Sequence, residues 1–207
     1  MGRMNTIAQP LWPAGRSQQQ DNVEHQAPGV ETTSEQLMLD FAQGNAKAFD
    51  VLYERHRESL YRFVYRHVGR RAQAEEIYQD TWVKVLNARH RYQPKARFQT
   101  WLYRIAHHRI IDWYRKSRPV TLAEPDQVPA QPVTDSATTE QIAKAINAAL
   151  INLPLDQRST VLLHLEKNMT LSEIAEICGC GRETVKSRMR YASAKLRDAL
   201  GGFYGEL

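Results

Sequence analysis

Cysteine is scarce in this chain of 207 residues: only Cys178 and Cys180 are present. Two possible ligands do not make a metal site, so we interpret both as small buried apolar residues, with a redox or metal role as the alternative. No run of 18 apolar residues occurs, which excludes the usual membrane-spanning helix. The N-terminus lacks a contiguous hydrophobic segment, so we expect no signal peptide and a cytoplasmic protein.

Strand-like alternation, internal repeats and glycine-rich phosphate loops are also missing, and the apolar residues recur at helical spacing, which predicts an all-α fold. The chain is basic: it contains 28 Lys and Arg and 23 Asp and Glu, which gives a net charge of +5. A basic chain favours a polyanionic partner, of which nucleic acid is the most common. The length is suited to one or two small domains.

The stretch from 170 to 197 has the pattern of a helix-turn-helix. Thr170 and Glu173 have the spacing of a capping box, and Gly179 stands where the first helix must end in a left-handed residue. A second helix from about Arg182 to Arg197 carries six basic residues and one acid. In this motif the second helix enters the major groove of DNA. An ordinary helical hairpin with a solvated basic face is the alternative interpretation.

A second basic stretch, from Arg97 to Arg118, holds six basic residues against one acid and is interleaved with aromatic residues. Cations can follow a phosphate backbone while aromatic rings stack on unpaired bases, so this composition favours single-stranded nucleic acid. Tyr103, Trp113 and Tyr114 are difficult to bury together in one small core. For each single aromatic residue, however, core packing remains an equally good interpretation.

The helix expected from about Ala72 to Ala88 has an acidic side formed by Glu75, Glu76, Gln79 and Asp80. Paired carboxylates can bind a metal or act as acid and base, but no histidine or further acid is placed to complete such a site. We therefore predict a solvated or protein-docking face, with no metal, no cofactor and no enzymatic activity.

The domain organisation follows from shifts in composition. We predict a disordered tail over 1–33, a helical domain over 34–118, an acidic proline-containing linker over 119–140, a second helical domain over 141–200, and a frayed tail over 201–207. The first domain includes a long amphipathic helix from Ala46 to about Val68, whose inner face carries His56 and His67. We interpret these two as core histidines.

Taken in order, three stretches give the chain a resemblance to bacterial RNA polymerase sigma factors of the extracytoplasmic-function (ECF) group. Residues 74–86 resemble the helix that docks on the clamp coiled coil of the polymerase beta-prime subunit. Residues 98–116 resemble the stretch that reads and melts the minus-10 promoter element, and residues 153–197 the domain that reads the minus-35 element. The resemblance covers about 34–200 and implies a region 2 bundle and a region 4 helix-turn-helix joined by a flexible linker.

The resemblance implies a promoter-specificity subunit that binds core polymerase, through the clamp and the beta flap, and promoter DNA, and it makes an anti-sigma factor an expected partner. The positions that carry polymerase docking are Glu75, Glu76, Gln79 and Asp80, with Trp82 behind them on the buried side of the helix. The minus-10 positions are Trp101, Tyr103, Arg104, His107, His108, Arg109, Asp112, Trp113, Arg115 and Lys116. The minus-35 positions are Arg182, Glu183, Thr184, Lys186, Ser187, Arg188, Arg190 and Tyr191, with Arg188 as a phosphate contact.

Three residues depart from the family pattern. Gln73 stands where an aspartate is common, so the acidic docking cluster has one charge fewer. His108 occupies a position where many members have asparagine, so the minus-10 sequence cannot be transferred from relatives. Gly181 replaces the usual Ser or Thr cap of the recognition helix, a loss of up to ~1 kcal/mol of local stability.

Two other classes of protein remain open from the residues. A helix-turn-helix repressor or activator would bind duplex DNA without docking on polymerase and would usually dimerise on a palindrome. The basic and aromatic stretch of 98–116 argues against it. A nuclease or recombinase would need clustered carboxylates or a nucleophile in a basic cleft, and the sequence shows no such set.

Overall fold

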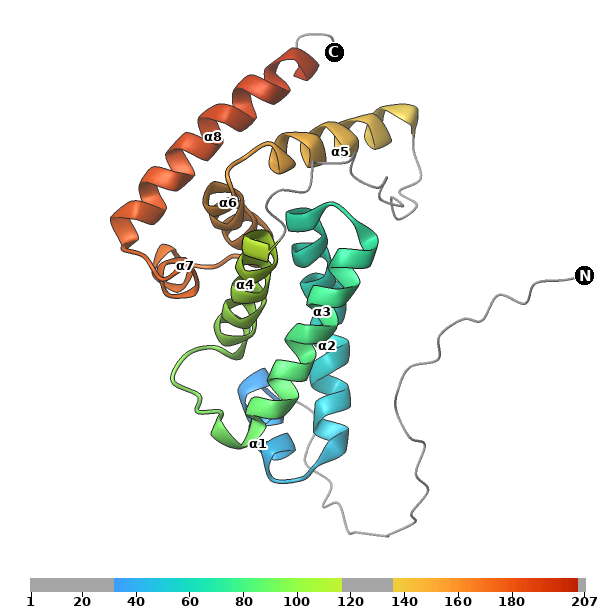
Figure 1. Cartoon of the computed structure of the whole chain (residues 1–207), viewed down its shortest axis with the longest axis vertical. Helices are drawn as coiled ribbons and strands as arrows, with labels where there is room; N and C mark the ends of the chain where they lie inside the picture. The colour runs from blue at the N-terminus through green and yellow to red at the C-terminus, as the bar shows by residue number, and fades with distance from the viewer. Residues whose placement is uncertain (1–31, 117–135, 205–207) are drawn as a thin grey trace, which may run out of the picture. The chain divides into compact units, whose positions relative to one another are not determined.

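The computed structural model describes residues 32–116 and 136–204, and every regular element in these two segments is helical. In chain order these are α1 (Ser34–Ala42), α2 (Ala46–Val68), α3 (Arg71–Ala88), the 3-10 turn η1 (Arg89–Arg91), α4 (Phe98–Lys116), α5 (Ser136–Ile151), α6 (Leu155–Lys167), α7 (Leu171–Cys178) and α8 (Arg182–Tyr204) (Figure 1). The predicted all-α fold is confirmed over this part of the chain. The N-terminal tail, most of the predicted linker and the last three residues lie outside the described segments.

Local capping residues set the helix ends where the sequence predicts them. The Thr170 hydroxyl accepts a bond from the Glu173 N–H while the Glu173 carboxylate accepts one from the Thr170 N–H, which is the predicted capping box. Gly179 ends α7 in the left-handed region at φ 62°, which costs a residue without a Cβ little. The Asn45 side chain caps α2 by accepting from the Ala48 N–H at 3.4 Å.

Helices α1 to α4 bury one apolar core. Leu52, Leu60 and Phe63 of α2 and Leu102 of α4 are fully buried. At one end of this core the Trp82 ring meets the rings of Phe49 and Tyr53 at centroid distances of 5.8 and 5.0 Å. Such tilted and edge-on contacts suit the charge distribution of aromatic rings. Together these contacts hold α3 and α4 in fixed positions on α2.

Helices α5 to α8 pack around a second set of buried residues, which includes Leu162 of α6, Ile174 of α7 and Val185 of α8. Two expected boundaries shift. Helix α5 begins at Ser136, so the helical part starts before the predicted end of the linker at residue 140, and α8 continues to Tyr204 through the predicted frayed tail. The packing of α8 on α5 explains the extension, because tertiary contacts hold a helix together past its glycines.

The Leu165 side chain of α6 is 67% exposed, whereas Val161 and Leu162 of the same helix are buried. Helix α6 contacts α2, α7 and α8.

Among the residues described, no helix is long and apolar enough to cross a membrane. Within the same residues no group of three or more His, Cys, Asp or Glu side chains is gathered as metal ligands would be.

The buried histidines make the fold acid-sensitive. The predicted core positions of His56 and His67 are confirmed, and His107 of α4 is buried as well. Burial lowers the pKa of His56 and of His107 to about 4 and that of His67 to about 3. A depressed folded-state pKa means that the unfolded chain binds more protons between that value and about 6.5, so stability is full above about pH 6.5 and falls as pH decreases.

We therefore expect the free energy of unfolding to fall by up to about 1.4 kcal/mol per pH unit for each of these histidines between about pH 6.5 and 4. Urea unfolding followed by circular dichroism at pH 7.5, 6.0 and 5.0 measures this slope. A free energy of unfolding that does not change over this pH range would contradict the prediction. It would show that the three imidazoles are solvated in the folded protein.

Candidate nucleic-acid interface

Helix α8 presents most of its predicted minus-35 positions to solvent. The exposed residues are Arg182, Glu183, Thr184, Lys186, Ser187, Arg190 and Tyr191. Two pairs are ordered before any ligand arrives. The Lys186 ammonium lies 2.7 Å from a Glu183 carboxylate oxygen, and the Arg190 guanidinium lies 5.1 Å from the centroid of the Tyr191 ring. The bond and the charge of Lys186 lower the pKa of the Glu183 carboxyl, so Glu183 stays ionised.

Arg188 differs from the other minus-35 positions. Its guanidinium donates to the Asp156 carboxylate at 2.5 Å and to the Cys180 thiol at 3.3 Å, and its side chain is only 22% exposed. The bond to Asp156 joins α8 to the first turn of α6. The structure therefore gives Arg188 intramolecular partners that help to seat the recognition helix, and its expected phosphate contact stays a prediction.

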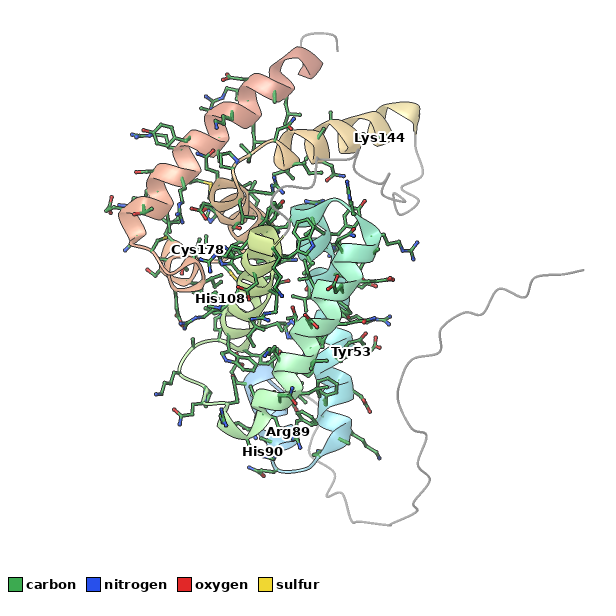
Figure 2. All side chains as sticks on the ribbon, viewed as in Figure 1. Tyr53, Arg89, His90, His108, Lys144 and Cys178 are labelled. Atoms are coloured by element: carbon green, nitrogen blue, oxygen red, sulfur yellow. The ribbon has the colours of Figure 1, made fainter. Side chains whose placement is uncertain are left out.

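The two cysteines lie at the turn between α7 and α8, and both are free thiols; Figure 2 labels Cys178. Cys178 ends α7, and burial followed by the neighbouring Cys180 raises the pKa of its thiol to about 12. A thiol held protonated is a poor nucleophile and metal ligand. This geometry agrees with the interpretation of Cys178 as a small core residue.

Helix α4 separates its predicted minus-10 positions into three groups. Arg104, His108, Arg115 and Lys116 are exposed, and Trp101, Arg109, Asp112 and Trp113 are partly buried. Arg109 is paired with Asp112 at 2.8 Å. The Trp113 ring packs edge-on against Tyr114 at 4.9 Å. The exposed and partly buried members give α4 a cationic surface with two accessible indole rings, at Trp101 and Trp113.

Tyr103 and His107, two further predicted minus-10 positions, lie in the interior of the described structure. The Tyr103 ring is fully buried against Phe63, and its hydroxyl donates to Ser59 at 3.1 Å. His107 is 1% exposed, and neither ring nitrogen has a hydrogen-bond partner in the structure. Period alone could not separate these two from Trp101 and Trp113, since nearly every side of α4 carries an aromatic ring or a long side chain.

Glu35 of α1 also supports this surface, and no pattern in the sequence singled it out. One of its carboxylate oxygens accepts the backbone N–H of Phe98 at 2.5 Å and so caps α4 from another helix. Partial burial acts to raise the pKa of Glu35. The hydrogen bond from the Phe98 N–H and smaller effects, including the charge of Arg97, outweigh the burial, so the pKa lies below the usual value. The side chain is thus ionised and can fix the first turn of α4, on which Trp101 stands.

Helix α3 carries the predicted acidic docking positions on one open face. Glu75, Glu76, Gln79 and Asp80 are all exposed, while Gln73 is half-buried. Trp82 lies behind this face as expected, buried among aromatic rings. Val83 was not selected from the sequence, yet it is 51% exposed beside Gln79 and Asp80 on the helix surface. The exposed face of α3 therefore combines acidic side chains with one apolar side chain.

Two protein-family models match the chain, and each covers one of the regions just described. Sigma-70 region 2 matches residues 52–120, which include α3 and α4. Sigma-70 region 4 matches residues 149–198, which include the helix-turn-helix of α7 and α8. The two models appear in the order that the motifs predicted.

Curated relatives match across both regions. The ECF RNA polymerase sigma factor SigX of Bacillus subtilis is 27% identical over 160 residues, which are 73% of this chain and 82% of SigX. The ECF RNA polymerase sigma factor SigM of Mycobacterium tuberculosis is 28% identical over 171 residues, covering 83% of this chain and 86% of SigM.

Solved structures share the fold. Sigma factor RpoE of Bartonella quintana, crystallised with the anti-sigma factor NepR, superposes with a TM-score of 0.65 at 23% identity over 75% of this chain and 98% of RpoE. CnrH in complex with the cytosolic domain of CnrY superposes with a TM-score of 0.64 at 24% identity over 82% of this chain and 97% of CnrH.

Proposed function

The chain belongs to the ECF group of RNA polymerase sigma factors and directs promoter-specific transcription initiation, and we propose that it does so through three separate surfaces. The acidic face of α3 docks on core polymerase, the basic and aromatic surface of α4 captures the minus-10 strand, and the exposed face of α8 reads the minus-35 duplex. The observation that carries this division is the exposure of the three sets of side chains on three helices.

The chemistry of each surface suits its proposed ligand. Lys186, Ser187 and Arg190 are exposed hydrogen-bonding side chains on a helix of the kind that enters a major groove. On α4, Arg104, Arg115 and Lys116 can follow phosphates while Trp101 and Trp113 offer faces to unpaired bases. Each stacked base supplies about 1–3 kcal/mol, against a cost of a few kcal/mol for each unstacked step. Capture of several bases is therefore required to keep the strands apart.

Neither DNA-binding surface needs high affinity by itself. When α3 holds the chain on polymerase, α4 and α8 are tethered to the same complex. Once one of them binds its promoter element, the other binds at a high effective concentration, so two weak contacts together give tight binding. We propose that the chain acts in the cytoplasm as a specificity subunit and not as an enzyme. A regulatory protein that binds this sigma factor, as NepR and CnrY do for the two structural relatives, belongs to the same proposal.

Run-off transcription with bacterial core polymerase on genomic promoter fragments tests the function. We expect defined start sites with the wild-type chain, and a loss of about 30-fold or more with Asp80→Arg, because a reversed charge at the centre of a docking face removes a hot-spot contact worth about 2 kcal/mol. Asp40→Arg, on α1, is the matched control and should keep initiation near the wild-type level.

The rival function, a helix-turn-helix regulator that acts without docking, gives a different result. In that case core polymerase plus the chain starts nothing, the chain alone shifts duplex DNA, and Asp80→Arg has no effect on the shift. Wild-type initiation together with full activity of Asp80→Arg would instead keep the sigma function and refute the docking face on α3.

A further inference from the structure

The first turn of α1 joins α2 to α4. Helix α1 lies beside the start of α4 (Figure 1), where the Glu35 carboxylate accepts the Phe98 N–H at 2.5 Å. The residue before Glu35 is bonded to α2, because the Ser34 Oγ lies 2.9 Å from Nε2 of the His56 ring. Two consecutive residues of α1 therefore hold two different helices in place.

Helix α4 depends on the contact with Glu35 because its own sequence supplies little at its N-terminus. The first turn of α4 contains no acidic residue, and Arg97 stands immediately before it, where the helix dipole favours an anion. The pKa of Glu35 lies below the usual value, so the acceptor is ionised, and a hydrogen bond to an ionised group is about twice as strong as one between neutral groups. Glu35 thus supplies, from another helix, the acceptor and the negative charge that an N-cap residue would provide.

The rings around Phe98 connect the first turn of α4 to Trp101. The Phe98 ring is fully buried, with its centroid 5.2 Å from that of His56 and 5.8 Å from that of Trp101. The Tyr92 ring, just before α4, lies 5.0 Å from the Trp101 ring. Trp101 is therefore held between two aromatic rings while part of its surface remains open to solvent. Because Phe98 belongs to the turn that Glu35 caps, fraying of this turn would also displace the indole.

We propose that Glu35 is a positioning residue for promoter opening: by capping α4 from α1, it keeps Trp101 in place to receive an unpaired base of the minus-10 strand. The inference rests on the proposed function of α4. It adds a role for α1, which precedes the residues 52–120 that match sigma-70 region 2. A turn that is ordered before DNA arrives loses less conformational entropy on binding, so more of the stacking free energy remains to hold the strands apart.

Glu35→Ala in the full chain, assembled with core polymerase, is tested on two templates. One is the duplex promoter, and the other is the same promoter held open by mismatches from the minus-10 element to the start site. On the duplex we expect strand separation, measured by permanganate reactivity of unpaired thymines, and run-off transcription to fall by about three- to tenfold. On the open template the loss should be less than about twofold, since no strand separation is required.

Asp40→Ala is the matched control, because it removes one negative charge from the same helix and the Asp40 carboxylate accepts from Gln36 within α1 at 2.7 Å. This variant should match the wild type on both templates. Activity of E35A on the open template shows that the variant folds and docks on polymerase. Equal losses of E35A on the two templates would place the defect in folding or docking and would overturn the proposal, as would wild-type opening of the duplex by E35A.

Glu35→Gln separates the acceptor from the charge. The amide oxygen can still accept the Phe98 N–H, so we expect opening of the duplex by E35Q to lie between that of the wild type and that of E35A. If E35Q is as impaired as E35A, the hydrogen bond to Phe98 does not position α4 and the proposal is overturned.

Failure of the proposed function has a different signature. In that case the wild-type chain itself gives no initiation with core polymerase on the duplex promoter. Failure of the positioning role leaves wild-type initiation intact and removes only the difference between the two templates in E35A.

Discussion

Replacement of Arg158 with alanine is expected to lower the free energy of unfolding by about 3–5 kcal/mol. Arg158 is 4% exposed although it is charged. Its guanidinium donates to the backbone carbonyls of His67, Ile151 and Leu153 and to the Tyr114 hydroxyl. The His67 and Ile151 carbonyls are at the C-terminal ends of α2 and α5, where the helix dipoles favour a cation.

Alanine would leave these acceptors buried without donors and would leave a cavity in addition. At about 2–4 °C per kcal/mol for a unit of this size, the midpoint of thermal unfolding should fall by about 10 °C. Differential scanning calorimetry at pH 7.5 measures the change. Arg62→Ala, which removes an exposed arginine from α2, should change stability by no more than about 0.5 kcal/mol. A loss of less than about 1 kcal/mol at Arg158 would show that water reaches these carbonyls in the folded chain.

The second large effect is expected on promoter recognition. Lys186→Ala with Arg190→Ala should reduce run-off transcription from a promoter of this sigma factor by about 30-fold or more, since each base-edge contact contributes about 1–3 kcal/mol. Both side chains are exposed on α8 and are held by local partners, Lys186 by Glu183 and Arg190 by Tyr191. Their order before binding reduces the entropy lost on the DNA.

Lys195→Ala with Arg197→Ala is the matched control, because it removes two charges from the same exposed helix further from its N-terminus. This pair should lower activity by only a few-fold through weaker phosphate attraction, with a smaller salt dependence. Equal losses from the two pairs would mean that α8 acts through its net charge alone and does not read base edges. Thermal unfolding of both variants should match the wild type, since none of the four side chains is buried.

The candidate surfaces were only partly predictable from the sequence. On α8 the helical period was enough to predict which positions face outward, because one side of that helix packs on its neighbours and the rest is polar. Most of the predicted minus-35 positions are accordingly exposed. In α4 the same reasoning failed for Tyr103 and His107, because aromatic residues occur on several sides of the helix. Their burial depends on Phe63 and on the residues of the second half of the chain, which no local pattern contains.

Val83 shows a similar limit on α3. The helical period placed Trp82 on the buried side of the helix, and the structure agrees, but it did not select Val83 as part of the exposed face. Phe49 and Tyr53 of α2 pack on Trp82, whereas Val83 is 51% exposed. Adjacent positions on a helix point about 100° apart, so the neighbour that packs on α3 decides which of the two is buried.

By itself the sequence determined the helices, several of their ends and the order of three functional stretches, because capping boxes, left-handed glycines and apolar periods act over a few residues. Only the tertiary structure decided that Arg158 is buried at two helix ends and that Glu35 caps α4. It also decided that the acidic side chains of α7 lie beside basic side chains at α4. These contacts join residues far apart in the chain, such as Thr100 with Glu173 at a separation of 73 positions. Such pairings arise when preformed helices pack to bury their apolar sides, and the charges on the facing surfaces are then brought together.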